Sequence, residues 1–370
     1  MKTAIVYDRV NKFGGAERVL LVLHEIFPKA PLYTSVYSPQ NATWAKVFPK
    51  VYTSFLNRFP FLRNNHEILS IFMPLAFESF NFDDYDLVIS VSSEAAKGII
   101  TKPKTRHLCY CLTPTRYLFS GFSQYRDNPP GGLKLIPFYK NISNPFISYL
   151  KKWDQIAAGR PDVMIAISKE VQNRIKKYYH RDSKLIFPPV DVVKFRNKSD
   201  FKPKEKNYYL IVSRLEPYKK VDLAIDAFVK LKKNLVVIGI GSQLGTYKSK
   251  YKQNKNILFE GFVPDDELPG YYQNARAFIF PQEEDFGITA VEAQASGSLV
   301  IAYKKGGALD TVVDGITGVF FDKQDVESLI TAIKRHERTK FDKNILWRNA
   351  KKFDCKRFKK EIVDLLEINV

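Results

Sequence analysis

Short apolar runs alternate with segments of helical periodicity along most of the chain. In the first half, the apolar runs predict strands at residues 3–7, 87–91, 107–112 and 163–167. Amphipathic segments at residues 14–26 and 170–179 predict helices. Alternation of strands and helices is typical of parallel sheets with crossover helices.

The pattern restarts after Pro188-Pro189-Val190-Asp191, which we interpret as the link between two domains. Helices are predicted at residues 221–231 and 357–366. Strands are predicted at residues 208–212, 235–238, 257–259, 277–280 and 299–301. We therefore expect an α/β fold of two doubly wound, Rossmann-like domains, residues 1–190 and 191–350, with an interdomain cleft. Ligands are expected at the carboxyl ends of the strands.

Composition agrees with two packed domains. The chain has 370 residues, 45% hydrophobic and 14% aromatic, and this length favours two cores. No segment approaches the roughly 20 apolar residues that span a bilayer, and the first eight residues predict a strand and not a signal peptide. The three cysteines are expected as reduced core residues of a cytoplasmic protein.

The net charge of +19 is large. An anionic membrane surface is the favoured partner, with a general lysine bias of the composition close behind. Nucleic acid is disfavoured because no zinc-finger spacing or RNA-binding aromatic motif is present. The apolar residues of segment 55–82 allow an amphipathic element that touches a membrane, but a core helix pair is the favoured interpretation.

Two carboxylates, Glu284 and Glu292, stand across a predicted strand–loop–helix junction. Pro281 ends the strand, and a helix is predicted to open at residues 286–289, with Gly287 leaving its backbone N–H groups approachable. Such a helix start attracts phosphate. A phosphate between two carboxylates suits a nucleotide-sugar, whose sugar and ribose each offer hydroxyls. Alone, the two acids would be read as solvated residues at a helix start.

Arg214 and Lys219 lie at the carboxyl end of the strand at residues 208–212. A departing diphosphate needs a metal or fixed cations, and these two side chains are candidates for that role. Lys220 is interpreted as ordinary surface charge. The Asp84-Tyr85-Asp86 motif offers a metal alternative, but it precedes a strand and is interpreted as a turn.

A nicotinamide site is weakly supported. Gly239-Ile240-Gly241 follows the strand at residues 235–238, but the third glycine, Gly245, comes one residue too late for the dinucleotide fingerprint. Gly14-Gly15 after the first strand permits close approach of backbone to a phosphate or sugar, and a tight loop of no function is the alternative.

A set of motifs now stands together: Ser213-Arg214-Leu215 with Lys219, Val221-Asp222, Glu284 with Glu292, Ala295-Ser296-Gly297, Gly306-Gly307, Asp314-Gly315 with Gly318, and residues 13–18 and 109–117 in the first half. The set resembles the retaining glycosyltransferases of family 4, which have the GT-B fold. It covers most of the second predicted domain and is similar to the mannosyltransferase-type subgroup that builds O-antigen and exopolysaccharide.

The resemblance implies roles for the catalytic candidates. Arg214 and Lys219 would bind the donor diphosphate, Glu284 would hold the donor-sugar hydroxyls, and Glu292 would hold the ribose. It also implies that the terminal helix, residues 351–370, returns to the first domain.

Further donor-binding roles follow from the same resemblance. The backbone of Phe286, Gly287 and Ile288 would cap the phosphates. Phe262 and Val263 would border the base, and Gly14 and Gly15 would lie under the transferred sugar.

The implied activity is transfer of a hexose, mannose or glucose, from GDP-mannose or UDP-glucose to a lipid-linked or polysaccharide acceptor. No metal or other cofactor is expected. The protein would act in the cytoplasm or peripherally at the inner face of the membrane. Retention without an evident nucleophile suggests front-face transfer, in which the leaving diphosphate helps to take the acceptor proton.

One position departs from the subgroup. Leu112 precedes Thr113-Pro114 where relatives often carry a histidine, and leucine can neither move a proton nor donate a hydrogen bond. An alternative function is therefore a catalytically weak sugar-nucleotide-binding partner in a glycan assembly complex. A nicotinamide oxidoreductase is the third possibility, which the late Gly245 disfavours.

Overall fold

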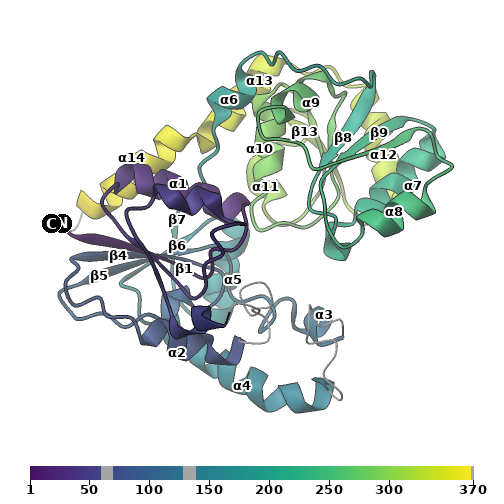
Figure 1. Cartoon of the computed structure of the whole chain (residues 1–370). Coiled ribbons are helices and arrows are strands. Elements are labelled where there is room, and N and C mark those ends of the chain that lie inside the picture. Colours follow the sequence, from purple (N-terminus) through teal and green to yellow (C-terminus); the bar gives the residue numbers. More distant parts are fainter. Residues whose placement is uncertain (60–69, 128–138, 368–370) are drawn as a thin grey trace. The chain divides into compact units, whose positions relative to one another are not determined.

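The computed structural model describes residues 1–59, 70–127 and 139–367. The chain divides into two compact units, residues 1–187 and 188–370 (Figure 1). Each unit contains one parallel sheet with helices packed against it. The predicted α/β class is thus confirmed. The expected return of the terminal helix to the first domain stays a prediction.

The sheet of the first unit has the strand order β3-β2-β1-β4-β5-β6-β7, all parallel. Its strands are β1 (Thr3–Tyr7), β2 (Leu32–Thr34), β3 (Val51–Thr53), β4 (Leu87–Ser92), β5 (Arg106–Cys111), β6 (Val163–Ala166) and β7 (Lys184–Leu185). Its α-helices are α1 (Gly15–Ile26), α2 (Met73–Glu78), α3 (Phe122–Asp127), α4 (Tyr139–Ala157) and α5 (Lys169–Tyr179).

The sheet of the second unit has the order β10-β9-β8-β11-β12-β13, again parallel. Its strands are β8 (Tyr208–Val212), β9 (Asn234–Ile238), β10 (Ile257–Gly261), β11 (Phe278–Phe280), β12 (Val300–Tyr303) and β13 (Gly318–Phe321). Its α-helices are α6 (Val192–Arg196), α7 (Val221–Leu231), α8 (Leu244–Lys250), α9 (Leu268–Asn274), α10 (Ile288–Ala295), α11 (Ala308–Thr311), α12 (Val326–Glu337), α13 (Lys343–Ala350) and α14 (Cys355–Glu367).

The strands of the second sheet are mostly apolar because helices cover both faces. Tyr209 and Ile211 of β8 point into a core shared with α7 and α12. On the other face, Phe278 of β11 packs edge-on against Tyr272 of α9. Successive strand residues alternate between the two cores, so polar residues are confined to the strand ends.

The sequence predicted the strands and helices with clear apolar patterns, but it did not predict several of the short strands. The predicted strands at residues 3–7 and 208–212 and the helix at residues 221–231 are confirmed at the same bounds. Helix α10 begins at Ile288, two residues after the predicted opening, because Gly287 has a left-handed φ of 93°. Strands β2, β3, β7 and β13 were not predicted, since two to four residues carry little periodicity.

The apolar segment at residues 55–82 contributes to the core of the first unit where the structure describes it. Leu56, Met73 and Phe77 are buried in one cluster, which confirms the core interpretation for these residues. Residues 60–69 of the segment lie outside the described residues. Cys109 and Cys111 are buried free thiols, as predicted, whereas Cys355 is half-buried. Within the described ranges, no helix combines the length and apolarity needed to cross a bilayer.

His107 in β5 predicts a pH dependence of stability. Its side chain is fully buried, with Nε2 2.8 Å from Ser90 Oγ. Burial, followed by the positive charges of Arg181 and Arg160, lowers the pKa of His107 to about 3. Below about pH 6.5 the unfolded chain therefore takes up a proton that the folded protein does not, and stability falls by about 1.4 kcal/mol per pH unit.

Urea unfolding at pH 7 and pH 5 checks this expectation. We expect His107 to lower the free energy of unfolding by about 2 kcal/mol over that interval. The variant His107→Gln should lack this component, so its stability should fall less steeply than that of the wild type. Equal slopes for the two proteins would show that His107 is not the group responsible.

Candidate functional site

The loops that follow β8 and β11 meet at the carboxyl edge of the second sheet. These two strands are neighbours, so side chains just beyond their ends lie close together. Lys219 Nζ, at the end of a short 3-10 helix (Pro217–Lys219), donates to Glu284 Oε1. Lys219 is 7% exposed. The structure thus brings together two of the predicted catalytic residues, which are 65 positions apart in the chain.

Arg214 occupies the exposed part of the same loop. Its Nη2 donates to the Tyr218 hydroxyl at 2.8 Å, which orients the guanidinium without burying it. The loop itself is fixed from below by backbone hydrogen bonds from Ser213 to Ile238 and from Leu215 to Ile240. A buried lysine and an exposed arginine therefore belong to one loop that backbone hydrogen bonds hold to the neighbouring strand β9 and the residues after it.

The loop after β12 fixes the position of Glu284. The Gly307 N–H donates to the Glu284 carbonyl oxygen at 2.8 Å. A Cβ atom at Gly306 would lie 2.3 Å from that oxygen, and one at Gly307 would lie 2.2 Å from the Cα of Phe286. Any larger residue would displace the loop that carries Glu284 and Phe286. Close backbone contact therefore explains the Gly306-Gly307 pair.

Helix α10 starts directly after this loop and directs its first N–H groups to the same edge. Gly287 is the residue before the helix, and a Cβ there would lie 2.8 Å from the ring of Phe280. The first N–H groups of a helix have no partner within it and attract anions. Phe286 is buried, and Ile288 begins the helix. Their predicted contact with phosphate stays a prediction.

Glu292 lies one turn inside α10 and is only 1% exposed. Its Oε2 accepts a hydrogen bond from the Tyr272 hydroxyl of α9 at 3.1 Å. Buried Gln294 of the same helix donates to the Thr311 carbonyl and accepts from Asn349 of α13 at 2.7 Å. The carboxylate of Glu292 is therefore held by a rigid helix. Its predicted bond to a ribose stays a prediction.

The sequence did not predict Tyr272 as a site residue, because an aromatic residue on a short helix shows no pattern that indicates a functional role.

Phe262 and Val263, the residues predicted to border the base, follow β10 at the same edge of the sheet. Phe262 is 73% exposed, whereas Val263 is buried.

Close backbone contact explains the first two glycines of the weak dinucleotide motif, Gly239 and Gly241. Cβ atoms at Gly239 and Gly241 would lie 1.8 and 2.5 Å from the carbonyl oxygens of the loop after β8.

Gly14 and Gly15 lie in the first unit, where Gly14 precedes helix α1. A Cβ atom at Gly14 would lie 3.3 Å from Glu17 Oε2. Glu17 is buried, and its Oε1 accepts a hydrogen bond from the Tyr7 hydroxyl at 2.7 Å. Burial, followed by the charge of Glu17, raises the pKa of Tyr7. The predicted contact of the two glycines with the transferred sugar stays a prediction.

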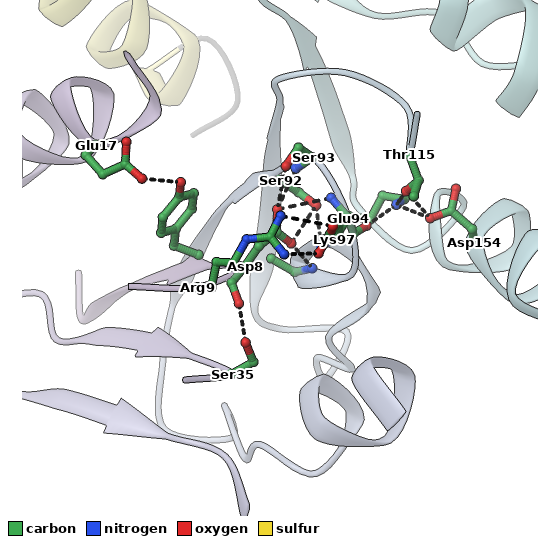
Figure 2. A network of polar contacts seen from close by, with 12 residues as sticks. Asp8, Arg9, Glu17, Ser35, Ser92, Ser93, Glu94, Lys97, Thr115 and Asp154 are labelled. Atoms are coloured by element: carbon green, nitrogen blue, oxygen red, sulfur yellow. Dashed lines mark hydrogen bonds and ion pairs between the residues drawn. The ribbon is translucent and has the colours of Figure 1, made fainter. Parts of the chain in front are cut away.

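A polar network lies at the carboxyl ends of β1 and β4 in the first unit (Figure 2). The carboxylate of buried Asp8 accepts hydrogen bonds from the backbone N–H groups of Ser93, Glu94 and Ala96. Arg9 binds Glu94 through two hydrogen bonds of 2.9 and 3.0 Å. Strand order reverses between β1 and β4, the position at which open α/β sheets bind ligands. Neither Asp8 nor Glu94 was predicted as a site residue.

The network continues to a buried ion pair. Lys97 Nζ lies 2.5 Å from Asp154 Oδ1, and Asp154 also accepts from Thr115 Oγ1 and the Tyr179 hydroxyl, each at 2.7 Å. Burial opposes the charge of Lys97, but Asp154 outweighs it and raises the pKa of Lys97. Asp8, Lys97 and Asp154 are all at most 1% exposed.

The motif at residues 84–86 lies at the amino end of β4, as predicted. Asp86 Oδ2 accepts a hydrogen bond from the backbone N–H of Lys2 at 2.6 Å. Across the described residues, no group of three or more His, Cys, Asp or Glu side chains is arranged to hold a metal ion.

The amino-acid sequence of the second unit is similar to that of known proteins. Residues 193–353, which contain the Lys219–Glu284 pair, match the family described as "Glycosyl transferases group 1". This region is therefore similar to group 1 glycosyltransferase domains. The chain is also 29% identical over 198 residues to a GDP-mannose-dependent alpha-(1-6)-phosphatidylinositol monomannoside mannosyltransferase of Mycolicibacterium smegmatis. The alignment spans 46% of the chain and 52% of that relative, about half of each.

Solved structures with a similar fold cover nearly the whole chain. Anabaena Alr3699/HepE in complex with UDP-glucose has a TM-score of 0.70 at 16% identity, with 99% of this chain and 100% of that chain covered. The sucrose-phosphate synthase of Thermosynechococcus elongatus has a TM-score of 0.73 at 16% identity, with 99% and 98% covered. At this identity the likeness establishes the fold alone, and the predicted GT-B fold is confirmed.

Proposed function

We propose that the protein is a retaining glycosyltransferase. It would move a hexose from a nucleoside-diphosphate sugar to a lipid-linked or polysaccharide acceptor, without a divalent metal. The contact between Lys219 and Glu284 carries the proposal. It places a cation for a diphosphate beside a carboxylate for sugar hydroxyls, both held at the carboxyl ends of neighbouring strands.

The diphosphate would be bound by protein cations and by helix α10. Lys219 supplies a buried ammonium, and Arg214 supplies an exposed guanidinium from the same loop. Such fixed charges stabilise a leaving diphosphate as negative charge develops on it. The backbone at Phe286, Gly287 and Ile288 would cap the phosphates at the helix start. These groups make a metal unnecessary for charge neutralisation.

The nucleotide would lie along the same edge of the sheet. Glu292, oriented by Tyr272, would accept hydrogen bonds from the ribose hydroxyls. The exposed ring of Phe262 offers a face for the base, and the next residue, Val263, is buried. The names of two similar proteins contain GDP-mannose and UDP-glucose, and we propose these two compounds as the candidate donors.

Retention of configuration would follow from front-face transfer. The leaving diphosphate would take part of the acceptor proton while Lys219 and Arg214 stabilise its charge. The family 4 assignment and the polysaccharide-building subgroup belong to this proposal. They rest on the Glu284–Glu292 spacing and on the Lys219 loop.

Peripheral binding to an anionic membrane is part of the proposal. Helix α4 exposes Phe146, Tyr149 and Ile156, and Lys151 and Lys152 are exposed on the same helix. Apolar side chains interleaved with lysines suit an anionic lipid surface, as does the net charge of +19. Sedimentation with phosphatidylserine vesicles, but not with phosphatidylcholine vesicles, is the expected result. Equal sedimentation with both would contradict an electrostatic contribution.

A catalytically weak binding partner is the second candidate, favoured by Leu112. This residue follows β5, at the carboxyl edge of the first sheet. The two functions differ in donor turnover. We expect slow release of UDP or GDP from the matching sugar conjugate in the presence of EDTA and without acceptor. Tight binding of the conjugate with no release, even when acceptor lipids are added, would favour the silent partner.

A further inference from the structure

Gln282 has an unusual environment at the donor site. It lies between the end of β11 and Glu284, and its side chain is 2% exposed. Its amide Nε2 lies 3.4 Å from Glu284 Oε1. Its carbonyl Oε1 is buried and accepts no hydrogen bond within the described residues. A buried acceptor without a partner costs stability, so packing alone does not explain a glutamine here.

One oxygen of Glu284 is shared between two donors. Lys219 Nζ donates to Glu284 Oε1 at close range, while Gln282 Nε2 approaches the same atom at 3.4 Å. An ammonium–carboxylate bond is stronger than an amide–carboxylate bond. The amide is therefore held at the long end of hydrogen-bond distance while the lysine occupies this oxygen.

Donor binding would change this competition. A diphosphate carries more negative charge than a carboxylate and draws the ammonium of Lys219 towards itself. Glu284 then loses its contact with the Lys219 ammonium at the moment when it must hold the sugar. The Gln282 amide lies two residues beyond the end of buried strand β11, and it is placed to shorten its bond to Glu284 as Lys219 withdraws.

We propose that Gln282 is a positioning residue for Glu284. It keeps the carboxylate aimed at the donor sugar once Lys219 has turned to the diphosphate. This inference rests on the proposed function, because it requires Glu284 to bind a sugar. It predicts that Gln282 matters for the sugar part of the donor and not for the nucleoside diphosphate.

The variant Gln282→Met tests the inference. Methionine has a similar volume and length but has neither the amide donor nor the orphaned carbonyl. We expect its melting temperature to equal or exceed that of the wild type, because a buried unsatisfied acceptor is removed. Calorimetric titration would use the pair that binds the wild type, either UDP with UDP-glucose or GDP with GDP-mannose. We expect roughly tenfold weaker binding of the sugar conjugate, with the free diphosphate bound within about twofold of wild type.

Gln324→Met is the matched control. Gln324 Nε2 donates to the carbonyl of Pro281, the residue before Gln282, at 2.8 Å. This substitution removes an equivalent amide bond from the same loop, through the backbone and not through Glu284. We expect it to weaken the free diphosphate and the sugar conjugate by the same factor, if it weakens either.

The outcomes separate the inference from the function on which it rests. Failure of the wild type to bind any nucleotide or conjugate would remove the proposed function itself. A wild type that binds both members of a pair, with Gln282→Met binding the conjugate equally well, would overturn the inference alone. Parallel loss of affinity for both compounds in Gln282→Met would also overturn it, since that result indicates a general packing role.

Discussion

Replacing Lys219 by methionine is expected to lower the kcat of sugar transfer by about 10²–10³-fold. The ammonium of Lys219 is fixed in a loop next to Glu284, where it would stabilise the charge that grows on the leaving diphosphate. Interactions that strengthen in the transition state appear in kcat more than in KM. Steady-state release of nucleoside diphosphate, measured in EDTA, gives both constants.

Lys220→Met is the matched control for this prediction. Lys220 is the next residue and is exposed. Its backbone has a left-handed φ of 53°, and this conformation places the same strain on methionine as on lysine because both side chains are unbranched at Cβ. Its kcat should remain within about twofold of wild type, because an exposed charge in water contributes little. A near-wild-type kcat for Lys219→Met would remove this lysine from the mechanism. An equal loss in both variants would point to general electrostatic attraction.

Replacing Lys97 by methionine is expected to destabilise the first unit by about 3–5 kcal/mol. The substitution leaves the carboxylate of Asp154 buried without its cation, and among the described residues the hydroxyls of Thr115 and Tyr179 remain as its donors. An uncompensated buried charge costs more than the lost hydrogen bond alone. Urea unfolding monitored by circular dichroism should show an early transition for this unit.

Two further variants show whether the cost is electrostatic. Lys102→Met removes an exposed lysine whose partner Asp83 is also exposed, and it should change stability by less than about 1 kcal/mol. The double variant Lys97→Met with Asp154→Asn removes both charges, so it should be more stable than Lys97→Met alone. A double variant that is less stable than Lys97→Met would show that Asp154 is not left as a stranded charge.

Local chemistry made much of the candidate donor site predictable from the sequence. Buried apolar runs define β8 and β11, and parallel neighbours place their carboxyl ends side by side. The meeting of Lys219 and Glu284 follows from that arrangement. The start of α10 was misplaced by two residues because its beginning depends on the left-handed φ of Gly287, which the apolar pattern does not encode.

Long-range packing determined what the sequence did not predict. Asp8 and Glu94 are 86 positions apart, and each resembles an ordinary acid at the end of a strand. Only the order of β1 and β4 in the sheet brings them together. Tyr272 and Gln282 likewise acquire significance through the atoms that they contact, Glu292 and Glu284. A signal existed for Gln282, a polar residue two positions after the end of a buried strand.

The central claim is that the second unit binds a nucleoside-diphosphate sugar through protein cations, without a metal. The most direct test is a thermal-shift panel of UDP, GDP, ADP and their sugar conjugates, in EDTA and then with Mg²⁺. A ligand at about 100 times its Kd stabilises the folded state by roughly 2.7 kcal/mol. We predict a raised melting temperature with one nucleotide family, equal in EDTA and in Mg²⁺. A shift that requires Mg²⁺, or no shift with any of the compounds, would contradict the claim.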